Sequence, residues 1–236
     1  MQYFRHAVQI IILVLLGAGL YTSVVRPKTL WLLGVALLAG NYFCGWVCPF
    51  GTVQEICSKI GSLLMKKKYR LPPAIQRYAQ FFRYLVMLAL LLLAAQGISG
   101  AMPFDAYRTF MGAAGGRAVQ TAALAIMGGF LLISLFCERP YCNYACTEGI
   151  RFCLASLTRL VTIKRDPKNC INCKRCSQAC PMNIAVAESE NVRNPQCINC
   201  FQCIAACPVP AALSYGRVEL FGARKTATVP DEQLTK

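Results

Sequence analysis

The chain has 236 residues, of which 56% are hydrophobic and 15% charged, and its mean hydropathy of +0.44 is too high for an ordinary soluble domain. It also carries 15 cysteines and a net charge of +15. The basic residues are spread along the chain and gather beside apolar stretches, which disfavours nucleic-acid binding and favours a membrane protein.

Four segments without Asp, Glu, Lys or Arg have about the length that a helix needs to cross a bilayer. They are residues 7–25, 29–48, 84–103 and 118–137. The first could be a signal peptide, but "VVRPKT" offers no small-residue cleavage site and a second span follows at once. We therefore predict a mainly α membrane protein with four transmembrane helices in two repeated pairs.

The distribution of Lys and Arg predicts the orientation of these spans. The loop over residues 52–83 holds seven basic residues, whereas each of the two opposite connections holds two. By the positive-inside rule, both termini and everything after the fourth span lie in the cytoplasm. The cysteine-rich end is therefore expected in a compartment that keeps thiols reduced, which disfavours disulfides.

A cysteine repeat follows each predicted pair of spans. "CGWVCPFG" begins at Cys44 and "CNYACTEG" begins at Cys142, 98 residues later, so both share the frame CxxxCxxG. A basic amphipathic stretch, expected to lie along a membrane surface, follows each repeat. Positions four apart share a helix face, so each pair can present two thiols to one point. We interpret Cys44, Cys48, Cys142 and Cys146 as a third iron–sulfur or zinc site; free cysteines that only pack are the alternative.

The composition changes near residue 166, from apolar to polar with dense cysteines. We predict a transmembrane domain over residues 1–165, a small α+β ferredoxin-like domain over 166–222, and a disordered tail over 223–236.

The strongest signal is the run Cx2Cx2Cx3CP, which occurs twice in the predicted ferredoxin domain, as "CINCKRCSQACP" and "CINCFQCIAACP". Bacterial two-cluster ferredoxins use this run, and its fourth cysteine binds the other cluster. Zinc is the alternative, but a doubled eight-cysteine run with both prolines is not typical of zinc sites. The spacing predicts one [4Fe-4S] cluster on Cys170, Cys173, Cys176 and Cys207, and another on Cys197, Cys200, Cys203 and Cys180.

Other chemistry finds little support in the sequence. No predicted span carries a charged residue of the kind that ion pumps need. His6 is the one histidine, so the chain cannot build a bis-histidine haem, and nucleotide-binding motifs are absent. We identify no catalytic residue. Cys57 has no assigned role, Cys153 is expected to be core, and Cys137 lies close enough to Cys142 to compete as a ligand.

With two CxxxC elements and a double-cluster end, the chain resembles the membrane polyferredoxins of the NapH and MauN type, and is similar in plan to the C-terminal part of the NosR regulators. Members carry CxxxCP twice, whereas this chain has Thr147 after Cys146. The resemblance implies an integral electron-transfer component of a prokaryotic cytoplasmic membrane. It further implies iron–sulfur, cytochrome or flavin partners and, in the nitrate-reductase case, a part in quinol oxidation, so a quinone cofactor is open.

The sequence thus predicts a membrane-bound iron–sulfur electron-transfer subunit. It would relay electrons between a quinol pool or a cytoplasmic donor and the partner proteins of an extracytoplasmic reductase or dehydrogenase, with lipid as a further partner. A redox-sensing or maturation factor for a metalloenzyme is the alternative hypothesis, and thiol–disulfide exchange through the CxxxC pairs is a third.

Overall fold

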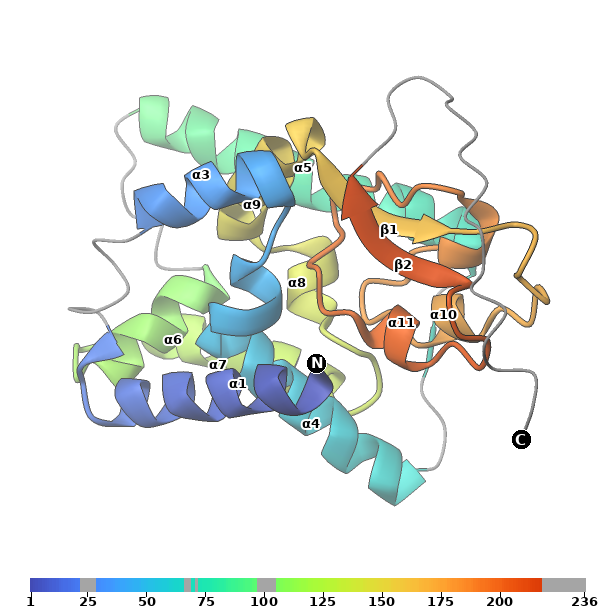
Figure 1. Ribbon diagram of the computed structural model, residues 1–236. Helices are drawn as coiled ribbons and strands as arrows, with labels where there is room; N and C mark the ends of the chain where they lie inside the picture. Colours follow the sequence, from blue (N-terminus) through green and yellow to red (C-terminus); the bar gives the residue numbers. More distant parts are fainter. Residues whose placement is uncertain (22–28, 66–68, 71, 97–104, 218–236) are drawn as a thin grey trace.

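The computed structural model (Figure 1) describes residues 1–21, 29–65, 69–70, 72–96 and 105–217, and the tail predicted over 223–236 lies outside them. A helical part comes first along the chain. Its elements are α1 (Gln2–Gly17), α3 (Thr29–Ala39), the π-helix η2 (Phe43–Val47), α4 (Pro49–Met65), α5 (Pro73–Ala95), α6 (Ala106–Ala114), α7 (Thr121–Ile133), α8 (Pro140–Tyr144), α9 (Thr147–Ala155) and the 3-10 helix η4 (Ser156–Thr158).

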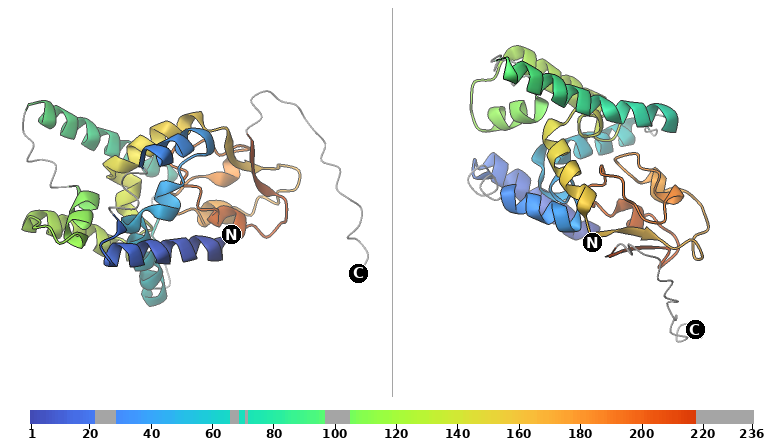
Figure 2. Two further views of the ribbon diagram at one scale, coloured as in Figure 1. Left: turned by 60° about the vertical axis from the view of Figure 1, so that its left-hand side comes forward. Right: turned by 90° about the horizontal axis from the view of Figure 1, so that it is seen from above.

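A smaller C-terminal unit follows the helical part. It consists of β1 (Val161–Arg165), α10 (Arg175–Gln178), the 3-10 helix η5 (Val186–Glu188), α11 (Gln202–Ala205) and β2 (Leu213–Arg217). The two strands pair antiparallel, with Val161 opposite Arg217 and Arg165 opposite Leu213. They lie at the end of the molecule away from α6 and α7 (Figure 2). Strand β1 thus pairs within the C-terminal unit although it precedes residue 166, where the sequence predicts the domain boundary.

The predicted four-helix transmembrane fold is wrong for the part of the chain that the structure describes. Among those residues, no helix combines the length and the apolar character needed to cross a membrane. The helices expected at residues 7–25, 29–48 and 118–137 are α1, α3 and α7, which have 16, 11 and 13 residues. The multi-pass topology and the cytoplasmic orientation inferred from them stay predictions.

Local geometry explains why these helices are shorter than their apolar stretches. Helix α1 ends at Gly17, and Gly19 two residues later has φ +71°. Helix α3 stops before Gly40, whose φ of +93° breaks the helical path. Glycine ends helices readily because it lacks a Cβ and so adopts a left-handed backbone without strain. A run of apolar residues therefore did not amount to one continuous helix.

The third predicted span, residues 84–103, overlaps only partly with α5. The helix begins at Pro73, eleven residues before that span, and ends at Ala95, while residues 97–104 lie outside the described part. Its first half carries Arg83, which is 1% exposed and packs inside the molecule. The helical path thus includes charged and polar positions that the charge-free window left out.

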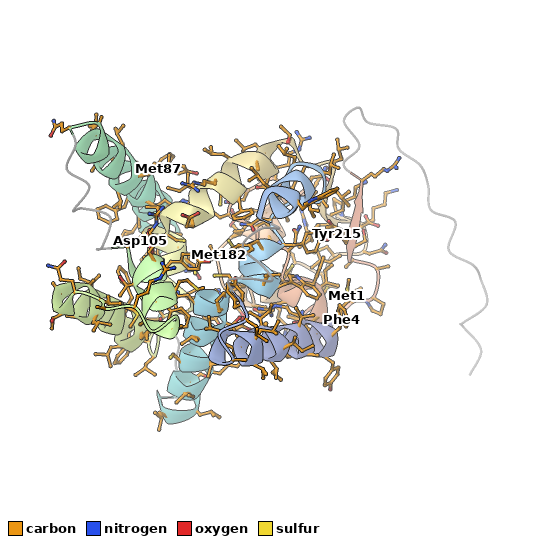
Figure 3. All side chains as sticks on the ribbon, turned by 90° about the vertical axis from the view of Figure 1, so that its left-hand side faces the viewer. Met1, Phe4, Met87, Asp105, Met182 and Tyr215 are labelled. Atoms are coloured by element: carbon orange, nitrogen blue, oxygen red, sulfur yellow. The ribbon has the colours of Figure 1, made fainter. Side chains whose placement is uncertain are left out.

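Helices α1 and α4 turn polar residues inward. Arg5 and Gln9 of α1 and Glu55 of α4 are buried, whereas Val14 of α1 and Leu63 of α4 are 64% and 82% exposed. This is the reverse of the pattern of a soluble amphipathic helix. Apolar side chains such as Phe4, 68% exposed, project outward (Figure 3). The inward polar groups lie next to the cysteine repeats.

Candidate iron–sulfur sites

The two ferredoxin-type runs fold in the same way. In each run, two residues between the cysteines adopt the left-handed conformation, Asn172 and Lys174 in the first and Asn199 and Phe201 in the second, with φ between 47° and 58°. A four-residue helix then follows, α10 or α11. Backbone turned in this way points successive N–H groups toward one side, which favours a negatively charged group there.

The first ferredoxin cavity lies between the start of the first run and the end of the second. It has a volume of about 20 Å³. Its lining includes the predicted ligand set, Cys170, Cys173, Cys176 and Cys207. Cys173 is exposed, so this cavity lies at the protein surface.

The second ferredoxin cavity has the same volume, about 20 Å³. Its lining includes Cys180, Cys197, Cys200 and Cys203, all of them buried. The fourth cysteine of each run therefore lines the cavity of the other run, as the spacing predicts. Aliphatic side chains, among them Ile184 and Val192, complete the wall.

A third cavity lies between the two CxxxC elements, and we call it the CxxxC cavity. Its volume of about 20 Å³ is the same as that of the two ferredoxin cavities. Cys44, Cys48, Cys142 and Cys146 all line it, although the two pairs are 98 residues apart in the chain. Cys153, which the sequence assigned to the core, lines it as well.

The two CxxxC elements have the same local geometry at their second cysteine. Cys48 has φ −70° and ψ 112°, and Cys146 has φ −72° and ψ 110°. Each sulfur accepts a hydrogen bond from the glycine N–H three residues on, at 3.4 Å in the first element and 3.2 Å in the second. Both cysteines thus precede a helix, α4 or α9, whose N-terminal dipole favours the thiolate. The two elements thus repeat one local geometry, and Thr147 preserves the turn that Pro49 makes.

The CxxxC cavity and the second ferredoxin cavity share a wall. Ile198 and Met182 line both of them. Across this wall, the indole Nε1 of Trp46 donates to the carbonyl oxygen of Asn199 at 2.9 Å, and the amide of Asn199 donates to the carbonyl oxygen of Ala39 at 2.8 Å. One layer of side chains therefore separates two cysteine-lined cavities.

We call the CxxxC cavity and the second ferredoxin cavity the inner cavities. Burial distinguishes their cysteines from those near the surface. It raises the pKa of Cys48 to about 12 and that of Cys200 to about 11, although Arg139 acts against it at both thiols. By contrast, the N–H of Asn172 and the side chain of Arg165 lower the pKa of Cys170. Metal binding requires the thiolate, so loading the inner cavities releases protons.

A buried ionic cluster, which we call the Arg5–Glu55–Arg139 triad, lies next to the CxxxC cavity and the second ferredoxin cavity. Arg5 and Arg139 donate to the same carboxylate oxygen of Glu55, at 2.5 Å and 2.7 Å. Burial alone would raise the pKa of Glu55, but Arg139 and Arg5 outweigh it and lower that pKa to about 2. Arg139 also donates to the carbonyl oxygen of Cys44 at 2.7 Å, and Arg5 to that of Gly45 at 3.0 Å.

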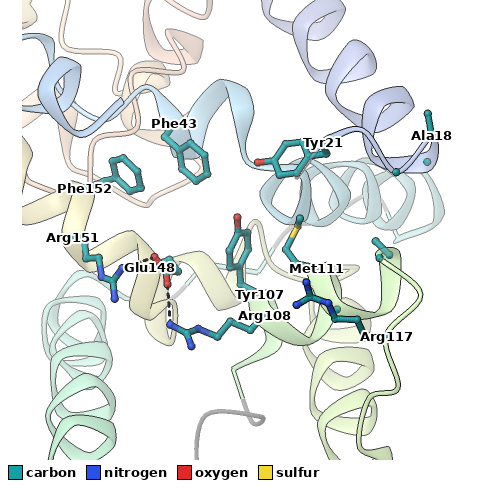
Figure 4. Close-up of a pocket in the computed structure, with 15 residues that line it drawn as sticks. Ala18, Tyr21, Phe43, Tyr107, Arg108, Met111, Arg117, Glu148, Arg151 and Phe152 are labelled. Atoms are coloured by element: carbon teal, nitrogen blue, oxygen red, sulfur yellow. Dashed lines mark hydrogen bonds and ion pairs between the residues drawn. The ribbon is translucent and has the colours of Figure 1, made fainter. Parts of the chain in front are cut away.

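A larger cleft of about 860 Å³, open to solvent, adjoins the CxxxC cavity (Figure 4). Phe43, Tyr107 and Glu148 line both. Rings dominate its inner wall, where Phe43 stacks on Phe152 with centroids 4.7 Å apart. Glu148 pairs at 3.4 Å with Arg108 and, from its other oxygen, with Arg151.

The remaining predicted residues stand apart from these cavities. Cys57 and Cys137 are half-buried thiols outside the linings of the three described cysteine cavities. The ring Nδ1 of His6 lies 3.1 Å from Gln9 Oε1. All fifteen cysteines lie in the described part of the chain, and none forms a disulfide. Among the described residues, no three His, Cys, Asp or Glu side chains gather in the manner of a site for a metal ion.

Two family models match this chain. The model of a 4Fe-4S binding domain matches residues 29–72 and again residues 119–156, which are the two CxxxC regions. The model of a 4Fe-4S dicluster domain matches residues 162–208. The chain therefore carries 4Fe-4S binding domains in both its helical part and its C-terminal unit.

Several curated proteins are similar in sequence. YccM of Escherichia coli K12, named as a candidate electron transport protein, is 30% identical over 165 residues, which cover 67% of this chain and 46% of YccM. The regulatory protein NosR of Pseudomonas aeruginosa is 26% identical over 68% of this chain and 22% of its own length. The ferredoxin-type protein NapH of Haemophilus influenzae is 29% identical over 72% of this chain and 58% of its own length.

These matches confirm the predicted resemblance to NapH and NosR. The chain spans about half the length of YccM and NapH and about a fifth of NosR. No solved structure matches it.

Proposed function

We propose that this chain, an iron–sulfur relative of the NapH and NosR proteins, is an electron-transfer subunit in which three clusters form one path. The single observation that supports this most is the series of three cysteine-lined cavities of similar volume, two of which share a wall. A bound [4Fe-4S] cluster would supply one-electron redox chemistry at each cavity.

The cysteine sets of the three cavities are proposed as the ligands. The first ferredoxin cavity offers Cys170, Cys173, Cys176 and Cys207, and the second offers Cys180, Cys197, Cys200 and Cys203. For the CxxxC cavity we propose Cys44, Cys48, Cys142 and Cys146, because both second cysteines cap a helix in the same geometry. The match of a 4Fe-4S binding domain to both CxxxC regions supports iron–sulfur over zinc there.

Side chains between the cavities would determine the path of the electrons. Ile198 and Met182 keep water out of the shared wall and keep the inner cavities close, which favours electron transfer because its rate falls steeply with distance. Cys173 is exposed, so the first ferredoxin cavity is the proposed exchange point for a soluble donor or a partner protein.

The cleft of Figure 4 is proposed as the other end of the path, where a quinol would bind. Its stacked rings Phe43 and Phe152 suit a flat ring, and Phe43 and Tyr107 also line the CxxxC cavity. Tyr21, raised in pKa by burial, contributes a polar hydroxyl to the same wall. Photolabelling with a quinone analogue should mark peptides of α6 and α9, whereas labelling confined to the C-terminal unit would contradict this assignment.

Association with the cytoplasmic membrane of a prokaryote stays a prediction. Large exposed side chains on α1, α3 and α4 support lipid as a partner, since apolar surface of this kind is typically covered. Examples are Val14, Trp31 and Leu63, which are 64%, 81% and 82% exposed.

Iron and sulfide analysis of the purified protein tests the proposal. Three clusters require about twelve irons per chain, and two require about eight. Replacing Cys44 and Cys48 by serine should then remove about four irons and one low-temperature EPR signal, while Cys57→Ser should leave both unchanged. Zinc in place of iron in the CxxxC cavity, or an unaltered iron content in the double variant, would refute the third cluster.

A second candidate function is a regulatory or maturation role, which the name of the relative NosR favours. It predicts that the Cys44→Ser–Cys48→Ser variant blocks maturation of a partner metalloenzyme but still passes electrons to partner protein that is already mature. Loss of electron flow to the mature partner would instead support the electron-transfer role.

A further inference from the structure

From the position of the Arg5–Glu55–Arg139 triad we infer that it is an electrostatic element shared by the CxxxC cavity and the second ferredoxin cavity, which raises the reduction potentials of both clusters. The inference rests on the proposed function, because it needs clusters in these cavities. It assigns a role to three residues that contribute no ligand and that are far apart in the sequence.

The triad is buried and carries a net positive charge. Arg5 is 0% exposed, Arg139 is 1% exposed and Glu55 is 5% exposed. Two guanidinium groups share one carboxylate, which leaves one positive charge uncompensated within the triad. A charge held away from water acts over a longer distance than a surface charge, because neither water nor salt screens it well.

The triad touches the backbone that presents the CxxxC cysteines. Arg139 Nη1 donates to the carbonyl oxygen of Cys44, and Arg5 Nε donates to that of Gly45. Arg139 also precedes α8, which carries Cys142.

The same triad reaches the second ferredoxin cavity from the other side. Gln202, at the start of α11, donates to the second oxygen of Glu55 at 3.2 Å. Gln2, one turn before Arg5 on α1, donates to the carbonyl oxygen of Cys200 at 3.0 Å. One charged group therefore lies within reach of two cavities.

The expected effect follows from charge balance. When an external reductant gives one electron to a [4Fe-4S] cluster, the cluster and its thiolates gain one negative charge and no bond breaks. A nearby buried positive charge favours the reduced form over the oxidised form. Removing one arginine charge should therefore lower both potentials, and removing the carboxylate charge should raise both.

Two substitutions of opposite sign test this directly. Arg139→Gln and Glu55→Gln each break the same ion pair, so a loss of structure alone would affect both in the same direction. For Arg139→Gln, the equilibrium constant for reduction of each inner cluster should fall at least about tenfold, which is about 59 mV for a one-electron couple. For Glu55→Gln it should rise by a similar factor. Arg5→Gln makes the same charge change as Arg139→Gln if that variant fails to fold.

The measurement is an EPR-monitored titration of the purified, cluster-loaded protein with dithionite. The Cys44→Ser–Cys48→Ser variant assigns the signal of the CxxxC cluster. Lys59→Gln is the matched control, because Lys59 also pairs with Glu55, at 3.7 Å, but is 54% exposed and so screened by water. Its potentials should stay at the wild-type values.

Opposite shifts of both inner clusters in the two variants support the inference. Shifts of the same sign, shifts confined to one cluster, or equal shifts in Lys59→Gln would overturn it. The outcome stays separable from the proposed function, since iron content reports whether a CxxxC cluster exists. If about eight irons are found, the third cluster fails, while the shift at the second ferredoxin cluster still decides whether the triad acts there.

Discussion

The backbone of Gly45 lies directly against the carbonyl oxygen of Ile198. A Cβ added at Gly45 would come within 2.2 Å of that oxygen, far below any real contact distance. Gly45 belongs to the first CxxxC element, and Ile198 to the second ferredoxin run. This contact holds the helical part and the C-terminal unit at the shared wall, and only glycine permits it.

Gly45→Ala should therefore separate the two parts. We expect a loss of about 1–3 kcal/mol in the free energy of unfolding, as for other overpacked sites, and slower electron transfer between the inner clusters. Thermal unfolding and stopped-flow reduction measure the two effects. Gly34→Ala is the control, because nothing lies within 4 Å of a Cβ there and alanine favours the helix by about 0.5–1 kcal/mol. Equal behaviour of both variants would contradict the role of the contact.

A second prediction separates Cys146 from Cys153, which both line the CxxxC cavity. Cys146 caps α9 and matches Cys48 in geometry, whereas Cys153 lies inside α9. Cys146→Ser should remove about four irons per chain, and Cys153→Ser should remove none. Iron analysis and EPR check this. An iron loss in Cys153→Ser alone would make Cys153 the ligand in place of Cys146.

A third prediction concerns Arg83, which is 1% exposed and lines the CxxxC cavity but not the second ferredoxin cavity. Arg83→Gln removes a buried positive charge from one cavity. The equilibrium constant for reduction of the CxxxC cluster should fall about tenfold, or about 59 mV. The second ferredoxin cluster should keep its potential. A shift of equal size at both clusters would show that the effect of Arg83 is not local.

A fourth prediction follows from the pKa of Glu55, which the two arginines lower to about 2 from an ordinary value of 4.5. Because the pKa is lower in the folded state, the ionised group stabilises the fold above about pH 4.5, and this contribution is lost as the pH falls toward 2. Its size is about 3 kcal/mol. Urea unfolding of iron-free protein at pH 7, 4.5 and 3 should show the loss in the wild type. In Glu55→Gln the free energy of unfolding should depend less on pH over that range. A dependence as steep as that of the wild type would argue against a lowered pKa of Glu55.

The C-terminal unit was the part most accessible from the sequence. The spacing Cx2Cx2Cx3CP fixes the loops so tightly that Cys180 and Cys207 line the cavities expected for them. The CxxxC pairs were also found, because the frame CxxxCxxG records a local motif in which a sulfur accepts an N–H from the following glycine. Local geometry of this kind is visible in a short stretch of sequence.

Contacts between residues far apart in the chain could not be predicted from the sequence. Arg139 and Glu55 are 84 residues apart, and nothing in either neighbourhood indicates the pair. Arg5 of α1 turns inward and donates to the carbonyl oxygen of Gly45, and Glu55 of α4 turns inward and accepts from Arg5 and Arg139, contacts that only the assembled fold reveals. Helix lengths were overestimated because Gly17 and Gly40 end helices within apolar runs. Cys153 could have been found, since a spacing of seven from Cys146 returns to the same helix face.

Thr147, which takes the position that Pro49 has in the first CxxxC element, changes what the second element is attached to. Its hydroxyl donates to Asp105, whose other oxygen accepts from Tyr141 at 2.6 Å and from the backbone N–H groups of Tyr107 and Arg108 at the start of α6. The first element contacts the C-terminal unit through Gly45. The second element is hydrogen-bonded to that unit as well, from Asn143 to Pro181, but also to the start of α6 at the rim of the open cleft. A molecule that binds in the cleft and displaces α6 would therefore also displace the turn that carries Cys146. Binding in the cleft is thus coupled to the geometry of one half of the CxxxC cavity.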